Sequence, residues 1–225
     1  MTFLEIMTEL ERVGTEKSRA IYALHGATGS YFGVSPAQFA RLQKKIKTDH
    51  ALAIELWNSG NIDAQIFATM IIDKNSVDDK LIDSWVKDIR YFALADAFVS
   101  GVVAPSLFSN PKMYSWITSN AEYIRRCGYT LLALLAGKNE SLSDDEFIRH
   151  LHVIGKEIQL MENRARQAMY EALIAIGKRN KLLNMEAMIV ASQVGPVYIE
   201  HGDKKIKASH AMEILADKKL RATLL

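Results

Sequence analysis

A chain of 225 residues that is 49% apolar and 24% charged, with only four prolines, has enough apolar surface for a sizeable core, and this excludes a mainly disordered protein. The 28 basic and 26 acidic residues give a net charge of +2, which is too small to indicate a nucleic-acid binder by itself. A local basic stripe would not show in this sum, so the distribution of charge is more informative than the total. Cys127 is the only cysteine, and this excludes an internal disulfide or a cluster of thiolate metal ligands.

The sequence shows no targeting segment and no membrane span. Its N-terminus, MTFLEIMTELERVGTEK, lacks the charged region followed by an apolar core that a signal peptide needs, so we expect a reduced, cytoplasmic protein. The longest nearly uncharged stretch, Tyr91 to Pro111, is interrupted by Asp96, Gly101 and Pro105, well short of the ~20 continuous apolar residues that a bilayer requires. We therefore expect no membrane as a partner.

Apolar residues recur at helical spacing along nearly the whole chain. Ser35-Pro36 predicts a helix start, Asn110-Pro111 predicts another, and the pattern Ser-x-x-Asp/Glu predicts capping boxes at Ser76, Ser119 and Ser143. The expected helices span residues 2–12, 17–25, 36–48, 50–58, 61–72, 78–89, 91–104, 111–117, 120–136, 144–160, 163–178, 180–193 and 208–217. Only VYIEHGDKKI, residues 197–206, predicts a short hairpin or an irregular loop.

Pairs of these helices recur at intervals of roughly 35 to 40 residues, which is close to the spacing of HEAT-like repeats. We therefore predict an all-α, HEAT-like helical-repeat solenoid, an α-α superhelix that forms a single domain over residues 1–225. Residues 1–34 would be an N-terminal helical cap, residues 35–193 the repeat pairs, and residues 194–225 a loop and a C-terminal helix. A plain helical bundle is the alternative.

Asp96 is the most unusual residue of the predicted helix 91–104. At about 100° per residue, it falls in the same sector as Phe92, Val99 and Val103, so a carboxylate lies within an apolar stripe. An ionised carboxylate removed from water has to be paired, protonated or exposed to a wet cleft. Asp96 is therefore a structural partner of an arginine, a functional carboxylate in a cleft, or a solvent-facing residue of a helix with another phase.

Basic residues gather in three segments, 36–48, 162–181 and the tail from residue 201. Each segment is either a solvated helix face or a surface that meets phosphate. Arg125 and Arg126 are different, because they begin the apolar helix YIRRCGYTLLALLA and at least one of them must point inward or into a cleft. An arginine in that position clamps a phosphate or pairs with Asp96.

The sequence indicates neither a metal nor an organic cofactor. His150 and His152 lie on divergent faces of a helix, which is poor zinc geometry. Gly26, Gly29 and Gly33 are not followed by Gly-Lys-Ser/Thr and do not follow a strand, so they do not predict a phosphate-binding loop. We expect no cofactor.

Four segments appear in a characteristic order: FGVSPAQFARLQKKIKTDHALAIELWNSGNIDAQIFATMI, WVKDIRYFALADAF, RARQAMYEALIAIGKRN and VGPVYIEHGDKKIK. Together they resemble the DNA alkylation repair family, the HEAT-like-repeat DNA glycosylases that excise alkylated purines. The resemblance extends from Gly33 to Lys207 and rests on the order of the segments.

The resemblance implies a role for several residues. Asp96, one helical turn after Phe92, matches the catalytic aspartate of the family, and Arg126 matches the arginine of the concave face, which would hold a phosphate. Tyr91 and Phe92 would contact the sugar or backbone of DNA. The remaining predicted DNA-binding residues are Arg166, Tyr170 and Lys178.

Two departures from the family bear on catalysis. Active members carry tryptophan at the position of Phe92, and a second tryptophan at the position of Glu171, beside Tyr170. Tryptophan offers a cation the strongest π face, so both losses weaken the expected grip on a positively charged lesion.

The resemblance thus implies a DNA glycosylase that hydrolyses the N-glycosidic bond of N3- or N7-alkylated purines in duplex DNA, acting as a monomer without a cofactor. The alternative is a non-catalytic HEAT-repeat scaffold that binds DNA or protein. In that alternative Asp96 is the structural partner of Arg126.

Overall fold

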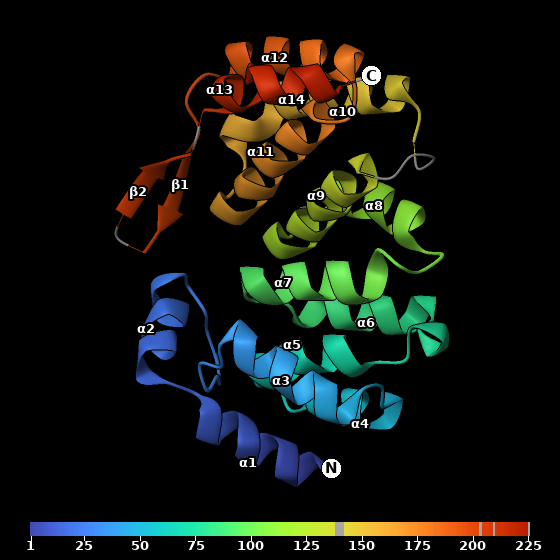
Figure 1. The fold of residues 1–225 in the computed structure, drawn as a ribbon, viewed down its shortest axis with the longest axis vertical. Helices are drawn as coiled ribbons and strands as arrows, with labels where there is room; N and C mark the ends of the chain where they lie inside the picture. The colour runs from blue at the N-terminus through green and yellow to red at the C-terminus, as the bar shows by residue number, and fades with distance from the viewer. Residues whose placement is uncertain (138–141, 203, 209, 225) are drawn as a thin grey trace. The chain divides into compact units, whose positions relative to one another are not determined.

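The computed structural model describes residues 1–137, 142–202, 204–208 and 210–224, which form helices and one short β-hairpin (Figure 1). The helices belong to two compact units. The first contains Met1–Ser109 with residues 201 and 202, and the second contains Asn110–Glu200 with the described residues after 203. The all-α prediction is confirmed, whereas the single domain over residues 1–225 stays a prediction.

The first unit is built around one helix that is covered on all sides. Its elements are α1 (Phe3–Val13), α2 (Glu16–Leu24), α3 (Pro36–Ile46), α4 (His50–Asn58), α5 (Ile62–Ile71), a 3-10 turn (Lys74–Ser76), α6 (Asp79–Asp88), α7 (Phe92–Phe98) and a π-helical turn (Val99–Val103). Every residue of α5 from Ile62 to Thr69 is buried, and α5 packs against α3, α4 and α7. Its apolar sequence explains this, because a helix that is apolar all round needs neighbours all round.

A buried carboxylate fixes the loop that precedes α3. Asp63, at 0% exposure, accepts hydrogen bonds from the peptide N–H groups of Phe32 (2.6 Å), Gly33 (2.9 Å) and Val34 (2.9 Å) and from the hydroxyl of Tyr22 (3.0 Å). Burial and the adjacent negative charge of Asp63 raise the pKa of the Tyr22 phenol. Since four donors surround the carboxylate, its burial is compensated.

Two stacked tryptophans form part of the core of this unit. The rings of Trp57 on α4 and Trp85 on α6 lie 4.0 Å apart with an interplanar angle of 1°, and Phe98 of α7 packs against both. The indole N–H of Trp57 donates to Asp88 at 2.9 Å. These contacts join α4, α6 and α7, and they place a fluorescent pair inside the first unit.

The second unit packs α11 against α9 and α12, and α10 against α12. Its elements are α8 (Ser109–Ile117), α9 (Glu122–Ala136), α10 (Asp144–Glu157), a 3-10 turn (Ile158–Leu160), α11 (Asn163–Gly177), α12 (Lys181–Val194), β1 (Tyr198–His201), β2 (Lys204–Lys207), α13 (Ala211–Leu215) and α14 (Lys218–Thr223). The approach of α8 and α9 requires Gly128, because a Cβ there would lie 2.5 Å from the peptide nitrogen of Ile117.

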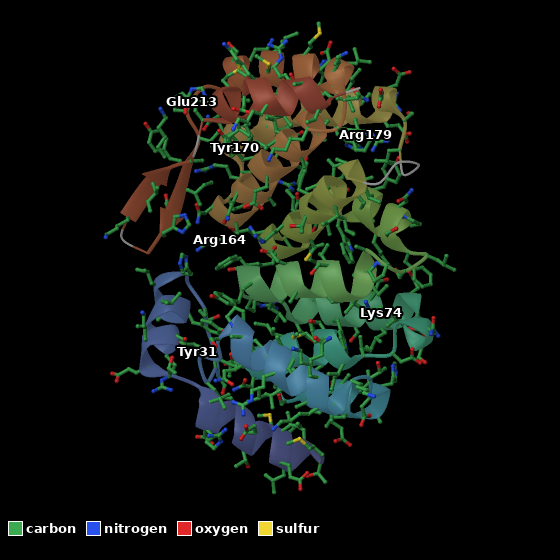
Figure 2. All side chains as sticks on the ribbon, viewed as in Figure 1. Tyr31, Lys74, Arg164, Tyr170, Arg179 and Glu213 are labelled. Atoms are coloured by element: carbon green, nitrogen blue, oxygen red, sulfur yellow. The ribbon has the colours of Figure 1, made fainter. Side chains whose placement is uncertain are left out.

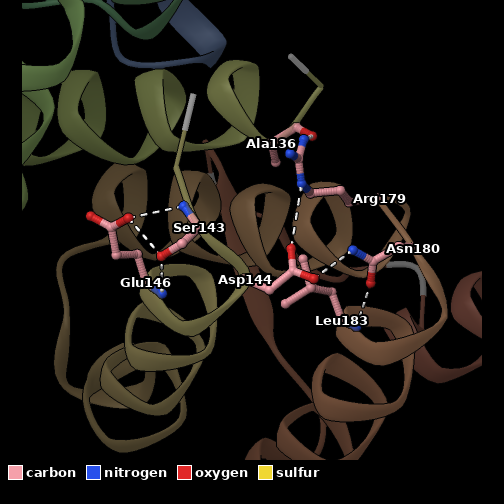
Figure 3. A network of polar contacts seen from close by, with 7 residues as sticks. All are labelled: Ala136, Ser143, Asp144, Glu146, Arg179, Asn180 and Leu183. Atoms are coloured by element: carbon pink, nitrogen blue, oxygen red, sulfur yellow. Dashed lines mark hydrogen bonds and ion pairs between the residues drawn. The ribbon is translucent and has the colours of Figure 1, made fainter. Parts of the chain in front are cut away.

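Arg179, in the connection between α11 and α12, ties together the ends of several helices (Figure 3). Its guanidinium donates to the carbonyl of Ala136 at the end of α9 (2.9 Å) and lies 3.8 Å from the carboxylate of Asp144 at the start of α10. Asn180 donates to the same carboxylate (2.9 Å) and accepts from the N–H of Leu183 (2.9 Å), which caps α12. The network satisfies backbone groups that helix ends leave without intrahelical partners.

Of the two alternatives predicted for residues 197–206, the hairpin is the one that forms, and it is anchored through its backbone. β1 pairs with β2 in a two-stranded sheet. Asn163, the first residue of α11, donates to the carbonyl of Glu200 (2.9 Å) and accepts from the N–H of Glu200 (2.7 Å). Arg166, one turn later, donates to the carbonyl of Tyr198 (3.2 Å). The orientation of β1 therefore follows that of α11.

Two predicted helix starts are confirmed. Pro36 is the first residue of α3, directly after Ser35. At the start of α10, the Ser143 hydroxyl accepts from the N–H of Glu146 (3.3 Å), and the Glu146 carboxylate accepts from the N–H of Ser143 (2.9 Å). This pair is the predicted capping box.

The capping boxes predicted at Ser76 and Ser119 are wrong. Ser76 lies in the 3-10 turn and donates to Asp73 (2.7 Å), and Asp78 caps α6 instead. Ser119 accepts from the N–H of Ala121 (3.1 Å), so its hydroxyl is also used in a turn before the helix. The pattern failed because a serine near a helix can equally close the preceding turn.

Two further boundaries differ from the prediction. α8 begins at Ser109, upstream of the start predicted at Asn110-Pro111. The single helix predicted over 208–217 is the shorter α13, and α14 follows it after Asp217, which caps α14 by accepting from the N–H of Leu220 (2.9 Å). Among the described residues, every helix is too short or too polar to cross a membrane.

Asp63→Asn should destabilise the first unit by about 3 kcal/mol. In the wild type the carboxylate accepts from three peptide N–H groups, whereas the NH₂ group of asparagine would be a donor facing these donors. Urea denaturation followed by the fluorescence of Trp57 and Trp85 measures this loss. Asp49→Asn is the matched control: Asp49 caps α4 through the N–H of Leu52 (3.0 Å), and asparagine caps equally well. Equal stabilities of the two variants would contradict the central role of Asp63.

Candidate nucleic-acid interface

Asp96 lies on α7 in the first unit, one turn after Phe92, and both side chains are half-buried. The helix does not keep its period beyond this point. From Val99 to Val103 it widens into a π turn, in which the N–H of Ala104 donates to the carbonyl of Val99 (2.8 Å), and both valines are fully buried. A π turn shifts the phase of the residues around it, so Asp96 lies at the edge of the buried stripe and not within it.

The π turn is held against α5. A Cβ at Gly101 would lie 2.9 Å from the carbonyl oxygen of Thr69, so no other residue fits there without a shift of the backbone. π turns inside α-helices occur frequently at functional sites. The π turn begins directly after the helical turn that carries Asp96, and this keeps Asp96 a candidate functional residue.

Phe92 belongs to a series of aromatic rings. Its centroid lies 5.5 Å from that of His25 and 4.9 Å from that of Tyr91. Tyr91 packs on Tyr22 at 5.0 Å, and Tyr22 packs on Tyr31 at 5.6 Å (Figure 2 labels Tyr31). Tyr91 is only 2% exposed, so the contact observed for it is packing beneath Phe92, and its contact with DNA stays a prediction.

In the second unit, Arg126 confirms that one arginine at the start of α9 points inward. It is 1% exposed and donates to the carbonyl of Arg164 on α11 (3.1 Å). The N–H of Arg164 in turn donates to Glu122 in the first turn of α9 (2.6 Å), and its guanidinium donates to Gln167 (3.1 Å). Side chains therefore join the first turns of α9 and α11. The phosphate contact of Arg126 stays a prediction.

The other predicted DNA-binding residues follow along α11. Arg166 donates to the carbonyl of Met161 (2.7 Å) as well as to β1. Tyr170, 8% exposed and labelled in Figure 2, accepts from the N–H of Ala211 (2.6 Å), and burial raises its pKa. Lys178 is exposed at the C-terminal cap of α11. Arg166 and Tyr170 thus have structural contacts, and their roles toward DNA stay predictions.

Phe92 and Glu171 stand where the resemblance implies tryptophan, and the structure shows their contacts. Phe92 packs on His25 and Tyr91. Glu171 is exposed and accepts from Gln167 (3.0 Å). Within the ranges described, no three His, Cys, Asp or Glu side chains are grouped so that they would hold a metal ion.

Sequence reasoning missed the roles of Tyr22, His25 and Arg164. Arg164 lies in the basic segment 162–181, so its presence near a helix start was visible. Its bond to Arg126, however, joins residues 38 positions apart and leaves no local pattern. The contact of Tyr22 with Asp63, 41 positions away, is equally invisible in a single sequence.

Comparison with known proteins decides the family. The model of the family described as DNA alkylation repair enzyme matches residues 6–211. The chain belongs to this family. Two uncharacterized proteins, one of Listeria monocytogenes and one of Listeria innocua, are similar to this chain; each is 24% identical over 226 residues, which cover 96% of this chain and 96% of the relative.

One solved structure is similar to this chain, with a TM-score of 0.86 and 28% sequence identity. The match covers 96% of this chain and 92% of the chain in that structure. That structure is described as a new family of proteins related to the HEAT-like repeat DNA glycosylases with affinity for branched DNA structures. The predicted fold class, an all-α HEAT-like helical repeat, is confirmed for this DNA alkylation repair family member.

Tyr170→Phe should cost about 1 to 2 kcal/mol of stability, because it leaves the buried N–H of Ala211 without its acceptor. Chemical denaturation followed by circular dichroism measures this cost, and Tyr31→Phe makes the same chemical change in the first unit as a control. Since the Tyr170 hydroxyl is engaged by the backbone of Ala211, the folded variant should keep whatever DNA affinity the wild type has. A large loss of DNA affinity at unchanged stability would show that the hydroxyl serves DNA.

Proposed function

We propose that this protein is a DNA-binding protein of DNA repair whose preferred ligand is branched DNA. The observation that carries the proposal is the solved relative described above: it is similar to this chain over nearly its whole length, and its family is described as having affinity for branched DNA structures. The family match over residues 6–211 supports the same class of ligand.

Exposed cations in both units support DNA as the ligand, although the net charge is only +2. In the first unit they include Arg41, Lys44 and Lys47, and in the second Lys178, Lys181, Lys204 and Lys207. Neutralisation of phosphates by such side chains releases counterions and supplies most of the affinity that does not depend on sequence. Affinity should therefore fall steeply with salt.

A second candidate function is excision of N3- or N7-alkylated purines from duplex DNA, and the position of Asp96 favours it. These lesions already carry positive charge, so the base leaves without a general acid. The barrier is the formation of an oxocarbenium-like sugar, which a fixed carboxylate stabilises electrostatically while it orients the attacking water. Asp96 would be that carboxylate, and Phe92, one helical turn before it, would lie at the sugar.

Two features rank this second candidate below DNA binding alone. The ring at position 92 is a phenylalanine packed on His25 and Tyr91, and position 171 carries an exposed glutamate. Neither offers the indole face that binds a cation best. The predicted monomeric state and cytoplasmic location belong to both proposals.

Wild type and Asp96→Asn, compared on two substrates, test both candidates. We expect both proteins to bind a four-way DNA junction more tightly than a linear duplex of the same length, with affinities within about twofold of each other, because one changed charge alters few phosphate contacts. Failure of the folded wild type to bind either DNA would refute the first candidate.

The same two proteins are then incubated with alkylated duplex DNA, and the release of N7-methylguanine and N3-methyladenine is measured. Release by wild type and not by Asp96→Asn would establish excision centred on this carboxylate. Release by neither protein, with binding intact, would leave DNA binding as the function.

A further inference from the structure

A polar cleft of 510 Å³ lies in the first unit at the C-terminal ends of α3 and α5. Three lysines from two separate segments line it: Lys44 and Lys47 come from the end of α3, and Lys74, labelled in Figure 2, comes from the 3-10 turn after α5. Thr48 and Asn75 add hydrogen-bond donors to its wall. The cleft therefore gathers positive charge and donors in one place.

The charge of the cleft is not neutralised within the described residues. None of its three ammonium groups is paired there with a carboxylate. The acidic residue of the wall, Asp73, accepts from the hydroxyl of Ser76 (2.7 Å) and from the N–H of Asn75 (3.0 Å), and these bonds lower its pKa. Asp73 therefore keeps its negative charge, and three lysines against this one carboxylate leave the wall with a net charge of +2, which favours an anion.

Lys47 is held in an unusual backbone conformation. Its φ of 61° and ψ of −107° make it the sole non-glycine residue with positive φ in the part of the chain that the structure describes. Glycine is the residue that adopts this conformation without steric cost. Strain of this kind clusters at ligand-binding sites, where the side chain is needed at that position.

Hydrogen bonds hold the walls of the cleft in place. The side-chain amide of Gln43 on α3 donates to the carbonyl of Met70 on α5 (2.9 Å), and the N–H of Lys47 donates to the carbonyl of Gln43 (2.8 Å). The first bond fixes the distance between α3 and α5, and the second holds Lys47 at the end of α3. An anion would therefore meet donors that are already in place, which limits the entropic cost of binding.

The cleft is separate from the aromatic series at Phe92. Asp63, which binds Tyr22 of this series, lies at the N-terminal end of α5, and the loop it binds precedes α3. The lysines of the cleft lie at the C-terminal end of α3 and after the C-terminal end of α5. These helices have 10 and 11 residues, so the two ends are about 15 Å apart at ~1.5 Å per residue. The cleft would add a contact that the candidate site around Asp96 does not include.

We propose that this lysine cleft binds a phosphodiester group of the DNA backbone. The proposal rests on DNA binding as the function, and it names one contact that gives this binding its affinity. Lys44, Lys47 and Lys74 supply the charge, and Thr48 and Asn75 supply further donors to the phosphate oxygens. The contact is made to the backbone alone and reads no base sequence.

The test compares Lys44→Ala/Lys74→Ala with Lys45→Ala as the matched control. Lys45 also lies on α3, but its charge acts on Glu9 of α1 and it does not line the cleft. Binding of a labelled four-way junction is measured at salt concentrations between about 50 and 200 mM. The double variant should lose about tenfold in affinity and reduce the slope of log K against log salt by about 1, the value for one phosphate contact.

Lys47→Gly separates a binding role from a structural one. The glycine removes backbone strain, so the melting temperature should rise, while the loss of the ammonium group should weaken binding of the junction. A higher melting temperature with an affinity equal to that of Lys45→Ala would show that the side chain of Lys47 does not contact DNA.

The outcomes distinguish this proposal from the one it rests on. If the wild type binds the junction and the cleft variants match Lys45→Ala in affinity and salt slope, the cleft proposal is overturned and DNA binding stands. If the folded wild type binds no DNA, both proposals are overturned.

Discussion

The first unit depends on one buried carboxylate. Asp63 stands in the first turn of the central helix α5, where a negative charge is favourable, and it takes three consecutive peptide N–H groups of the loop before α3. Its fourth bond holds the hydroxyl of Tyr22, whose ring packs on Tyr91 beneath Phe92. The ring of Phe92, one turn before Asp96, is thus positioned indirectly by Asp63, which is buried and lies on α5, a different helix.

Local regularities in the sequence predicted most of this fold, and contacts between distant residues explain what they missed. Helical spacing located α1 to α12, and the capping box at Ser143 was correct because its serine and glutamate bind each other's backbone. The same pattern failed at Ser119, whose hydroxyl closes a turn instead. The four bonds of Asp63 could not be predicted, because their partners lie 29 to 41 positions away.

The candidate functional residues were likewise predicted where a local pattern marks them and missed where distant contacts decide. The sequence singled out Asp96 and Arg126 as polar groups in apolar helices, and the structure finds the first half-buried and the second almost fully buried. A constant helical period could not reveal the π turn after α7, which places Asp96 at the edge of the buried stripe. The helical period also could not reveal that the hydroxyl of Tyr170 accepts a hydrogen bond from the backbone N–H of Ala211. In this family member, several residues expected at DNA also support the fold.

The attachment of the hairpin has a consequence for how its sequence can vary. Asn163 and Arg166 bind main-chain groups of β1, namely the carbonyl of Tyr198 and the N–H and carbonyl of Glu200. Every residue except proline carries the same main-chain N–H and carbonyl groups, whatever its side chain. Substitutions at the exposed positions 198 and 200 can therefore alter the chemistry that this strand presents without loosening its hold on α11, which makes β1 a segment where surface properties can diverge among relatives while the helical scaffold is retained.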